Sequence, residues 1–169
     1  GAQTAALAFG GEDPGGLTAK NESWNGSGWT EVGDLNTARK SAGAATQLAT
    51  TSLIFGGDTA GNGTPTQACE SWNGTAWTEV NDLNTTSRNL SGAGISTAAM
   101  AMGRYNPTAS NYELVEQFNG TSWTEVADML TSRHSTSSCG TQGAALTAGG
   151  ATNQTATEEF SGVYTVTVE

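Results

Sequence analysis

The residue types that perform most enzymatic chemistry are scarce in this 169-residue chain. His134 is the only histidine, so one chain cannot build a multi-histidine metal site. A Ser-His-Asp set would have to combine His134 with Ser135 and Asp128, its neighbours in one turn, and nothing in the sequence suggests an oxyanion hole. Acidic residues at the spacing of a calcium loop are also missing. We therefore expect no catalytic residues, no metal ion and no cofactor.

The two cysteines do not suggest redox or metal chemistry either. Cys69 and Cys139 stand far apart in the sequence, unlike the closely spaced cysteines of zinc or dithiol sites. A free cysteine behaves as a small apolar residue and is commonly buried. Both are predicted to be buried thiols.

Three arginines recur at similar places and are the sharpest candidates for ligand binding. Arg39, Arg88 and Arg133 each follow a loop that contains an aspartate. A ring of guanidinium groups could hold a carboxylate or an acidic sugar through forked hydrogen bonds. The alternative, which we favour, is that each arginine pairs with a nearby carboxylate and joins one repeat unit to the next.

Two tyrosines are further candidates for contact with a ligand or partner. Tyr105 and Tyr112 bracket Asn106 in a loop, and rings with a polar tip are suited to stacking on sugars or anchoring a protein. Alternatively, the tyrosines pack against Arg104 and close the loop on itself. Paired carboxylates for glycoside cleavage cannot be identified, because the glutamates of the repeated Trp-Thr-Glu-Val motif are predicted to lie in outermost strands.

These candidates belong to a chain that repeats itself. The sequence ESWNGTAWTEVNDLN, which begins at Glu70, has near copies that begin at Glu22 and Glu116, and an eroded copy begins at Glu158. A second motif, an apolar run that ends at glycine, recurs with the same step of roughly 46 residues, a period that fits one four-stranded unit.

Each unit is predicted to hold four strands. In the second unit the tiny residues of Ser41–Ala45 form the first strand, Thr51–Phe55 the second, and Cys69–Trp72 and Trp77–Val80 a hairpin that turns at Asn73-Gly74. Strands of Gly, Ala and Ser allow backbones to approach closely around a common axis. This pattern favours a β-propeller, in which such strands are innermost.

The chain resembles the kelch repeat family in its paired glycines, third-strand aromatics, fourth-strand tryptophans and recurring arginines. The residues are Gly10, Gly11, Gly56, Gly57, Gly149 and Gly150; Trp24, Trp72, Phe118 and Phe160; Trp29, Trp77 and Trp123; and Arg39, Arg88 and Arg133. Arg104 replaces the second glycine of the third copy, and Tyr164 stands where a fourth tryptophan is expected. The NGTSWTEV motif is also similar to the repeated motifs in propeller modules of marine bacteriophage tail-fibre and virion proteins.

We therefore expect one all-β, kelch-like β-propeller domain over residues 1–169. Its four blades of four antiparallel strands would span residues 1–34, 39–82, 88–128 and 133–169. Gly1-Ala2-Gln3 aligns with Gly140-Thr141-Gln142, so the first blade should lack its innermost strand. The blades would form part of a larger propeller in a longer chain, or a four-bladed ring that a strand from elsewhere completes.

Composition and resemblance together suggest partners. A net charge of −10 with only 13% charged residues disfavours binding to nucleic acid or anionic lipid, and no apolar stretch is long enough for membrane insertion. The resemblance implies a non-catalytic virion or extracellular component that presents variable loops to a host glycan or to other virion proteins, and that could form homo-oligomers. The alternatives are a kelch-type adaptor for protein partners and, less favoured, a sialidase-like or other glycan-active enzyme.

Overall fold

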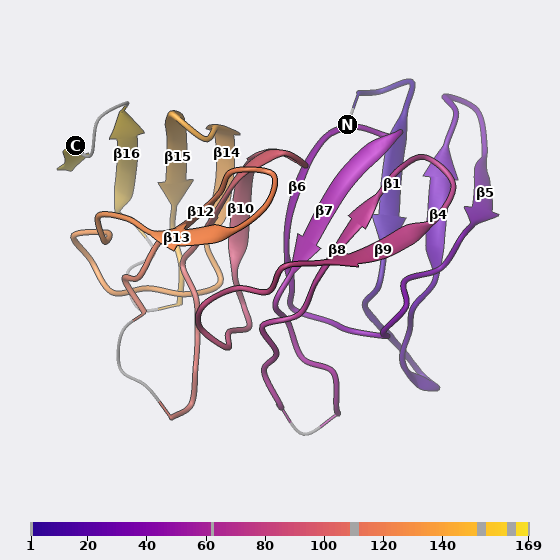
Figure 1. The fold of residues 1–169 in the computed structure, drawn as a ribbon, viewed down its shortest axis with the longest axis horizontal. Coiled ribbons are helices and arrows are strands. Elements are labelled where there is room, and N and C mark those ends of the chain that lie inside the picture. The colour runs from indigo at the N-terminus through magenta and orange to yellow at the C-terminus, as the bar shows by residue number, and fades with distance from the viewer. Residues whose placement is uncertain (1, 62, 109–111, 152–154, 162–164, 169) are drawn as a thin grey trace.

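The computed structural model describes residues 2–61, 63–108, 112–151, 155–161 and 165–168. All regular elements among these residues are strands, and four antiparallel sheets lie side by side in chain order (Figure 1). The predicted all-β propeller fold is confirmed.

Each of these four sheets is one blade. Blade 1 contains β1 (Ala6–Phe9), β4 (Asn21–Trp24) and β5 (Trp29–Val32), and a small hairpin of β2 (Glu12–Asp13) and β3 (Gly16–Leu17) between β1 and β4 forms a further two-stranded sheet. Blade 2 contains β6 (Gly43–Leu48), β7 (Thr51–Phe55), β8 (Cys69–Trp72) and β9 (Trp77–Val80). Blade 3 contains β10 (Ser91–Ile95), β11 (Ala98–Met102), β12 (Glu116–Phe118) and β13 (Trp123–Glu125). Blade 4 contains β14 (Ser137–Thr141), β15 (Ala144–Ala148), β16 (Thr157–Ser161) and β17 (Thr165–Val168).

Blade 1 has three strands, in the order β1-β4-β5, so the prediction that it lacks an innermost strand is confirmed for the described residues. Ala2 forms an isolated antiparallel bridge with Ala5. That bridge corresponds to the last pair of the innermost hairpin in blade 4, where Thr141 pairs with Ala144. The chain therefore enters blade 1 at the end of an innermost strand.

The first strands of blades 2, 3 and 4 pack against one another through very small residues. A Cβ on Gly92 of β10 would collide with the carbonyl oxygen of Ala44 in β6 and with the Phe55 ring. Only glycine fits there, because the backbones of neighbouring blades approach so closely. This arrangement confirms that the tiny residues form the hub.

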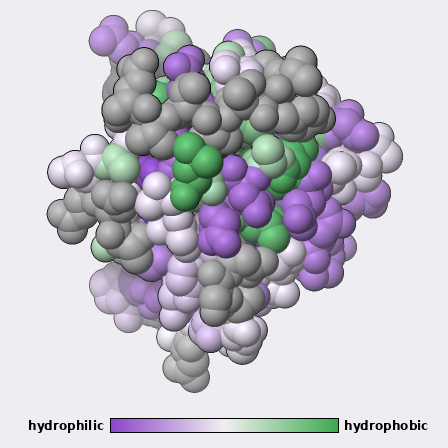
Figure 2. All heavy atoms as spheres, turned by 90° about the vertical axis from the view of Figure 1, so that its left-hand side faces the viewer, coloured by the Kyte–Doolittle hydropathy of each residue, from purple (hydrophilic) through white to green (hydrophobic). Residues whose placement is uncertain are grey.

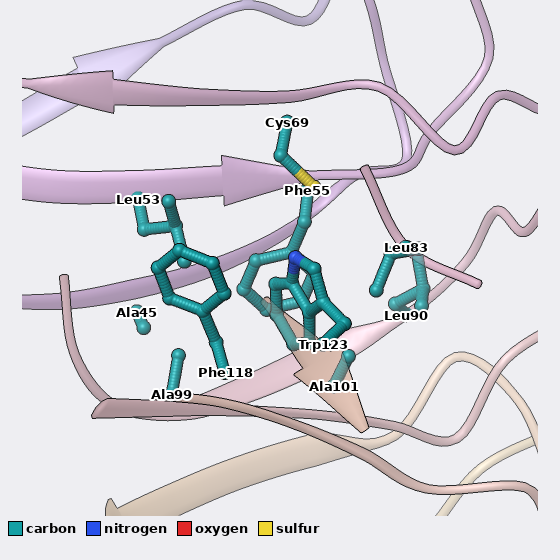
Figure 3. Close-up of a cluster of buried hydrophobic side chains, with 10 residues drawn as sticks. All are labelled: Ala45, Leu53, Phe55, Cys69, Leu83, Leu90, Ala99, Ala101, Phe118 and Trp123. Atoms are coloured by element: carbon teal, nitrogen blue, oxygen red, sulfur yellow. The ribbon is translucent and has the colours of Figure 1, made fainter. Parts of the chain in front are cut away.

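Away from the hub, aromatic pairs hold the blades together. The Phe9 ring of blade 1 meets Trp77 of blade 2 at 4.9 Å, and the Phe55 ring of blade 2 meets Trp123 of blade 3 at 5.0 Å, both edge to face. Figure 3 shows the second contact, in which Leu53 and Phe55 face Phe118 and Trp123. Blades 1 and 2 thus each cover the tryptophan of the blade that follows.

The contact between blades 3 and 4 is built differently. Met102 takes the place of the phenylalanine, and Met100, Met102, Met129 and Phe160 line a hollow between the two blades. Methionine adapts to such irregular space because its side chain is unbranched and flexible. Tyr164, the predicted counterpart of the fourth tryptophan, lies outside the described residues. The strand register instead places Val166 opposite Phe160, as Trp123 is placed opposite Phe118.

Removing the indole of Trp123 should be far more costly than removing that of Trp29. Trp123 is 5% exposed and donates from Nε1 to the Asn81 carbonyl oxygen, whereas Trp29 is 50% exposed. We expect Trp123→Ala to lower the free energy of unfolding by about 3–5 kcal/mol and Trp29→Ala by less than about 1 kcal/mol. Urea unfolding followed by far-UV circular dichroism would measure both, and equal losses would contradict the proposed packing.

Candidate functional site

Two of the three predicted binding arginines are buried. Arg39 is 1% and Arg133 0% exposed. Arg39 Nη2 lies 2.7 Å from Glu70 Oε1, and its Nη1 donates to the carbonyl oxygens of Ala68 and Gly56. Arg133 makes the equivalent contacts with Glu158, Ala156 and Gly149. The structure therefore favours the structural role for both arginines over a ring that grips a ligand.

The paired glutamates also hold the chain that leads into each blade. Glu70 accepts hydrogen bonds from the backbone N–H groups of Asn36 and Thr37, at 2.7 and 3.3 Å. Glu158 accepts equivalent bonds from the N–H groups of Leu130 and Thr131, at 2.7 and 3.1 Å. We call each set of guanidinium, glutamate and backbone N–H groups an Arg–Glu clamp. It joins the connection from one blade to the third strand of the next.

Blade 3 builds its clamp with an arginine from another place in the chain. Asn84 donates from its N–H to Glu116, as Asn36 does to Glu70, so Ser87 occupies the position of Arg39. The guanidinium comes instead from Arg104, whose Nη1 lies 2.9 Å from Glu116 Oε1 and donates to Ser87 Oγ. This exchange explains why an arginine replaces the second glycine of the third copy.

The predicted equivalence of Arg88 with Arg39 and Arg133 is therefore wrong by one residue. Arg88 corresponds to Lys40 and His134, and each of these three precedes a residue with positive φ: Ser41, Asn89 and Ser135. In blade 3, Ser87 stands at the position that arginine has in the other blades, and Arg88 follows it directly. Because an arginine was still present one residue away, the sequence alone did not reveal the correct alignment.

Burial lowers the pKa of the Arg104 guanidinium, and the charge and hydrogen bonding of Glu116 oppose that shift. Arg104 Nη2 is buried and has no hydrogen-bond partner among the described residues. Blade 3 thus has the least completely satisfied guanidinium of the three clamps.

Lys40, Arg88 and His134 form a row on the side where the long connections emerge, which we call the loop face. Each contacts the preceding blade. Lys40 Nζ lies 2.7 Å from Glu12 Oε2, Arg88 Nη1 lies 2.9 Å from Asp58 Oδ2, and the His134 ring lies 5.0 Å from that of Tyr105. The Asp58 hydrogen bond raises the pKa of Arg88. The cations of this row are therefore already paired.

Aromatic side chains gather at the end of this row. Tyr105 and Tyr112 stack with ring centroids 5.3 Å apart, and His134 meets both rings edge-on. The Arg88 guanidinium lies 5.0 Å from the Tyr105 centroid. The alternative that the tyrosines close their loop on itself agrees with this stack, but the guanidinium beside them is that of Arg88, since Arg104 is in the clamp. We call Arg88, Tyr105, Tyr112 and His134 the aromatic cluster.

Asn106 anchors the start of the loop through hydrogen bonds to residues outside the aromatic cluster. Its Nδ2 donates to the Thr86 carbonyl oxygen at 3.0 Å, and its Oδ1 accepts from the N–H and hydroxyl of Thr108. It therefore anchors the chain that carries Tyr105.

Burial and the neighbouring charge of Arg88 lower the pKa of His134, so its imidazole is neutral at pH 7. His134 Nδ1 lies 3.1 Å from the Ser135 hydroxyl, but no carboxylate is bonded to this histidine in the described part of the chain. Asp128, which a Ser-His-Asp set would have to use, is thus not hydrogen-bonded to His134 in this part of the structure. The described residues also contain no group of three His, Cys, Asp or Glu side chains that could hold a metal ion.

A second hollow, of about 300 Å3, lies along the axis. Its lining is formed by small residues of β6, β10 and β14, among them Ala44, Gly92, Gly94 and Ser138. Cys139 also lines it and is exposed, so the predicted burial of this thiol is wrong. Cys69 is buried as predicted, and desolvation raises its pKa to about 12, which makes the thiol unreactive.

Comparisons with known proteins support the fold alone. No family model and no curated protein matches the chain. Among solved structures it is similar to YjhT, with a TM-score of 0.74 and 14% sequence identity over 90% of this chain and 52% of that one. The chain thus spans about half the length of YjhT. In the described residues no helix is long and apolar enough to cross a membrane.

Moving the blade 3 guanidinium back to the position that the other blades use should restore stability. Arg104→Gly alone leaves the buried Glu116 carboxylate without its cation and should cost about 3–5 kcal/mol of unfolding free energy. The double variant Ser87→Arg with Arg104→Gly should recover most of that loss, because it recreates the Arg39 arrangement. Chemical denaturation measures both, and a double variant no more stable than Arg104→Gly would show that the two positions are not equivalent.

Proposed function

We propose that this chain is a non-catalytic recognition module whose loop face binds a glycan. The observation that carries the proposal is the aromatic cluster, which places two tyrosines, an imidazole and a guanidinium at the boundary between blades 3 and 4. Tyrosine rings offer an apolar face for stacking and a hydroxyl for hydrogen bonds, as sugar recognition requires.

The charges of the loop face favour a neutral glycan over an acidic one. Three of the six Lys and Arg side chains, Arg39, Arg104 and Arg133, are buried in clamps. On the loop face Lys40 pairs with Glu12 and Arg88 with Asp58, and His134 is neutral. A chain with a net charge of −10 would repel an anionic ligand that found no unpaired cation.

The variation among loops also supports recognition. The β7–β8 and β11–β12 connections and their counterparts differ in length and sequence, while the clamps and tryptophans recur. A constant frame allows such loops to diverge at little cost to stability. By resemblance to propeller modules of phage fibres, we place the module on a virion, where it would contact a host glycan or neighbouring virion proteins.

A glycan array followed by calorimetry of the best ligand tests this function. We expect a neutral glycan to bind, and Tyr112→Ala to weaken it about tenfold or more, the scale of losing one aromatic contact. The matched control is Leu48→Ala, which removes a 58% exposed side chain at the β6–β7 turn, on the side opposite the long loops (Figure 1).

Binding that survives Tyr112→Ala unchanged, or that is equally weakened by Leu48→Ala, would contradict the proposed site. Capture of one protein ligand with no glycan bound would favour the adaptor function instead. The proposed location has its own test, which is whether this chain is found by mass spectrometry in purified virions from its source.

A further inference from the structure

The turn between the third and fourth strands is built in the same way in blades 1, 2 and 3. Each of these turns, which we call the Asn-Gly tips, has an exposed asparagine followed by a glycine whose φ lies between 92° and 96°. The pairs are Asn25-Gly26, Asn73-Gly74 and Asn119-Gly120. A fourth such pair begins at Asn62, which lies outside the described residues.

Two backbone N–H groups converge on the side-chain oxygen of each tip asparagine. Asn73 Oδ1 accepts hydrogen bonds from the N–H groups of Thr75 and Ala76, at 2.9 and 3.0 Å. The corresponding distances are both 3.0 Å at Asn25 and both 2.9 Å at Asn119. Donors aimed at one carbonyl oxygen stabilise negative charge that develops on it, as an oxyanion hole does. The turn therefore polarises the side-chain amide for nucleophilic attack at Cγ.

The backbone nitrogen of the following glycine is the nucleophile nearest along the chain to that carbon. None of the three glycine N–H groups donates a hydrogen bond to a described residue. Glycine has no Cβ to shield its nitrogen. A bond from the glycine nitrogen to the asparagine Cγ would close a five-membered ring.

We propose that the Asn-Gly tips are sites of spontaneous deamidation, with water as the only co-reactant. The glycine nitrogen gives its proton to solvent and bonds to the asparagine Cγ, and Oδ1 takes up the negative charge. The bond from Cγ to Nδ2 then breaks, and Nδ2 takes a proton from solvent and leaves as ammonia. Water hydrolyses the resulting succinimide at either carbonyl group, which gives aspartate or isoaspartate.

Asparagines of the Arg–Glu clamps lack this arrangement. Asn84 Nδ2 donates to Glu116 Oε2 and to the Trp123 carbonyl oxygen, both at 3.0 Å. Asn36 is held in the same way in blade 2. Threonine rather than glycine follows both asparagines. The fold thus holds the amide of the clamp asparagines by its nitrogen and that of the tip asparagines by its oxygen.

The tips lie on the side opposite the loop face. A Cβ on Gly74 would lie 3.3 Å from the carbonyl oxygen of Thr50 in the β6–β7 turn, and Gly120 has the same relation to Thr97 in the β10–β11 turn. Deamidation would add three negative charges there to a chain whose net charge is −10. Such carboxylates are readily solvated on a surface where polar side chains are widespread, as Figure 2 shows for the side on which blade 4 lies.

Peptide mapping by mass spectrometry of the intact 169-residue protein, incubated at neutral pH, tests the proposal. We expect the three tip asparagines to deamidate about tenfold or more faster than Asn84, because Oδ1 of each tip is already bonded to two donors. Unfolding in urea should slow the tips, which lose those donors, and should speed Asn84, which leaves its clamp. Tips that deamidate faster in urea than in the folded protein would overturn the proposal.

A single substitution tests the role of the N–H donors. Ala76→Pro removes one donor from the tip of blade 2 alone. Deamidation of Asn73 should slow about fivefold or more, a smaller effect than in a buried oxyanion hole because the turn is exposed. Asn119 in the same molecule is the matched control and should keep its rate.

An Asn73 rate that Ala76→Pro leaves unchanged would contradict the proposal. Circular dichroism shows whether the variant folds, and the urea comparison decides the matter if it does not. The aromatic cluster lies on the other side of the molecule, so neither experiment bears on glycan binding.

Discussion

The positions of blades 2, 3 and 4 each depend on a buried ion pair whose remaining donors and acceptors are nearly all hydrogen-bonded. Taking a guanidinium and a carboxylate out of water is costly, and the pair is tolerable only when further hydrogen bonds occupy the remaining donors and acceptors. The Arg39 clamp meets that requirement with two carbonyl oxygens, two backbone N–H groups and the Asn36 amide, all around Glu70. Because Asn36 and Thr37 lie in the connection between blades 1 and 2, the clamp fixes where that connection enters blade 2.

The exchange of arginine positions in blade 3 shows which feature of the clamp is required. Ser87 stands where the other blades have arginine, and Arg104 stands where they have glycine, yet a guanidinium still reaches Glu116. The requirement is therefore for a cation beside the buried carboxylate, not for arginine at one place in the repeat. Once the clamps and hub hold the frame, the connections on the loop face can carry different side chains, such as the tyrosines beside His134.

Much of the fold could be predicted from the sequence because its signals are local. The Asn-Gly turns, the glycine-terminated strands and the tiny residues of Ser41–Ala45 each dictate backbone geometry, and their recurrence gave the blades and the three-stranded first sheet. The site could not be predicted to the same degree. The ion pair of Arg39 with Glu70 joins residues 31 positions apart in the sequence, and no local pattern distinguishes Glu70 from an ordinary exposed glutamate. The one-residue error at Arg88 has the same origin, because only the contacts of Glu116 reveal the register. Contact of Tyr105 with His134 likewise depends on how blades 3 and 4 meet.

The most direct test of this account is a double-mutant cycle between the two charges of one clamp. Arg39→Met, Glu70→Gln and the double variant would be compared by chemical denaturation. If the guanidinium and carboxylate depend on each other, the two single losses will not add, and the coupling energy should be about 2–3 kcal/mol. Additive losses, with a coupling energy below about 0.5 kcal/mol, would mean that packing at the hub and tryptophans positions the blades without the clamp.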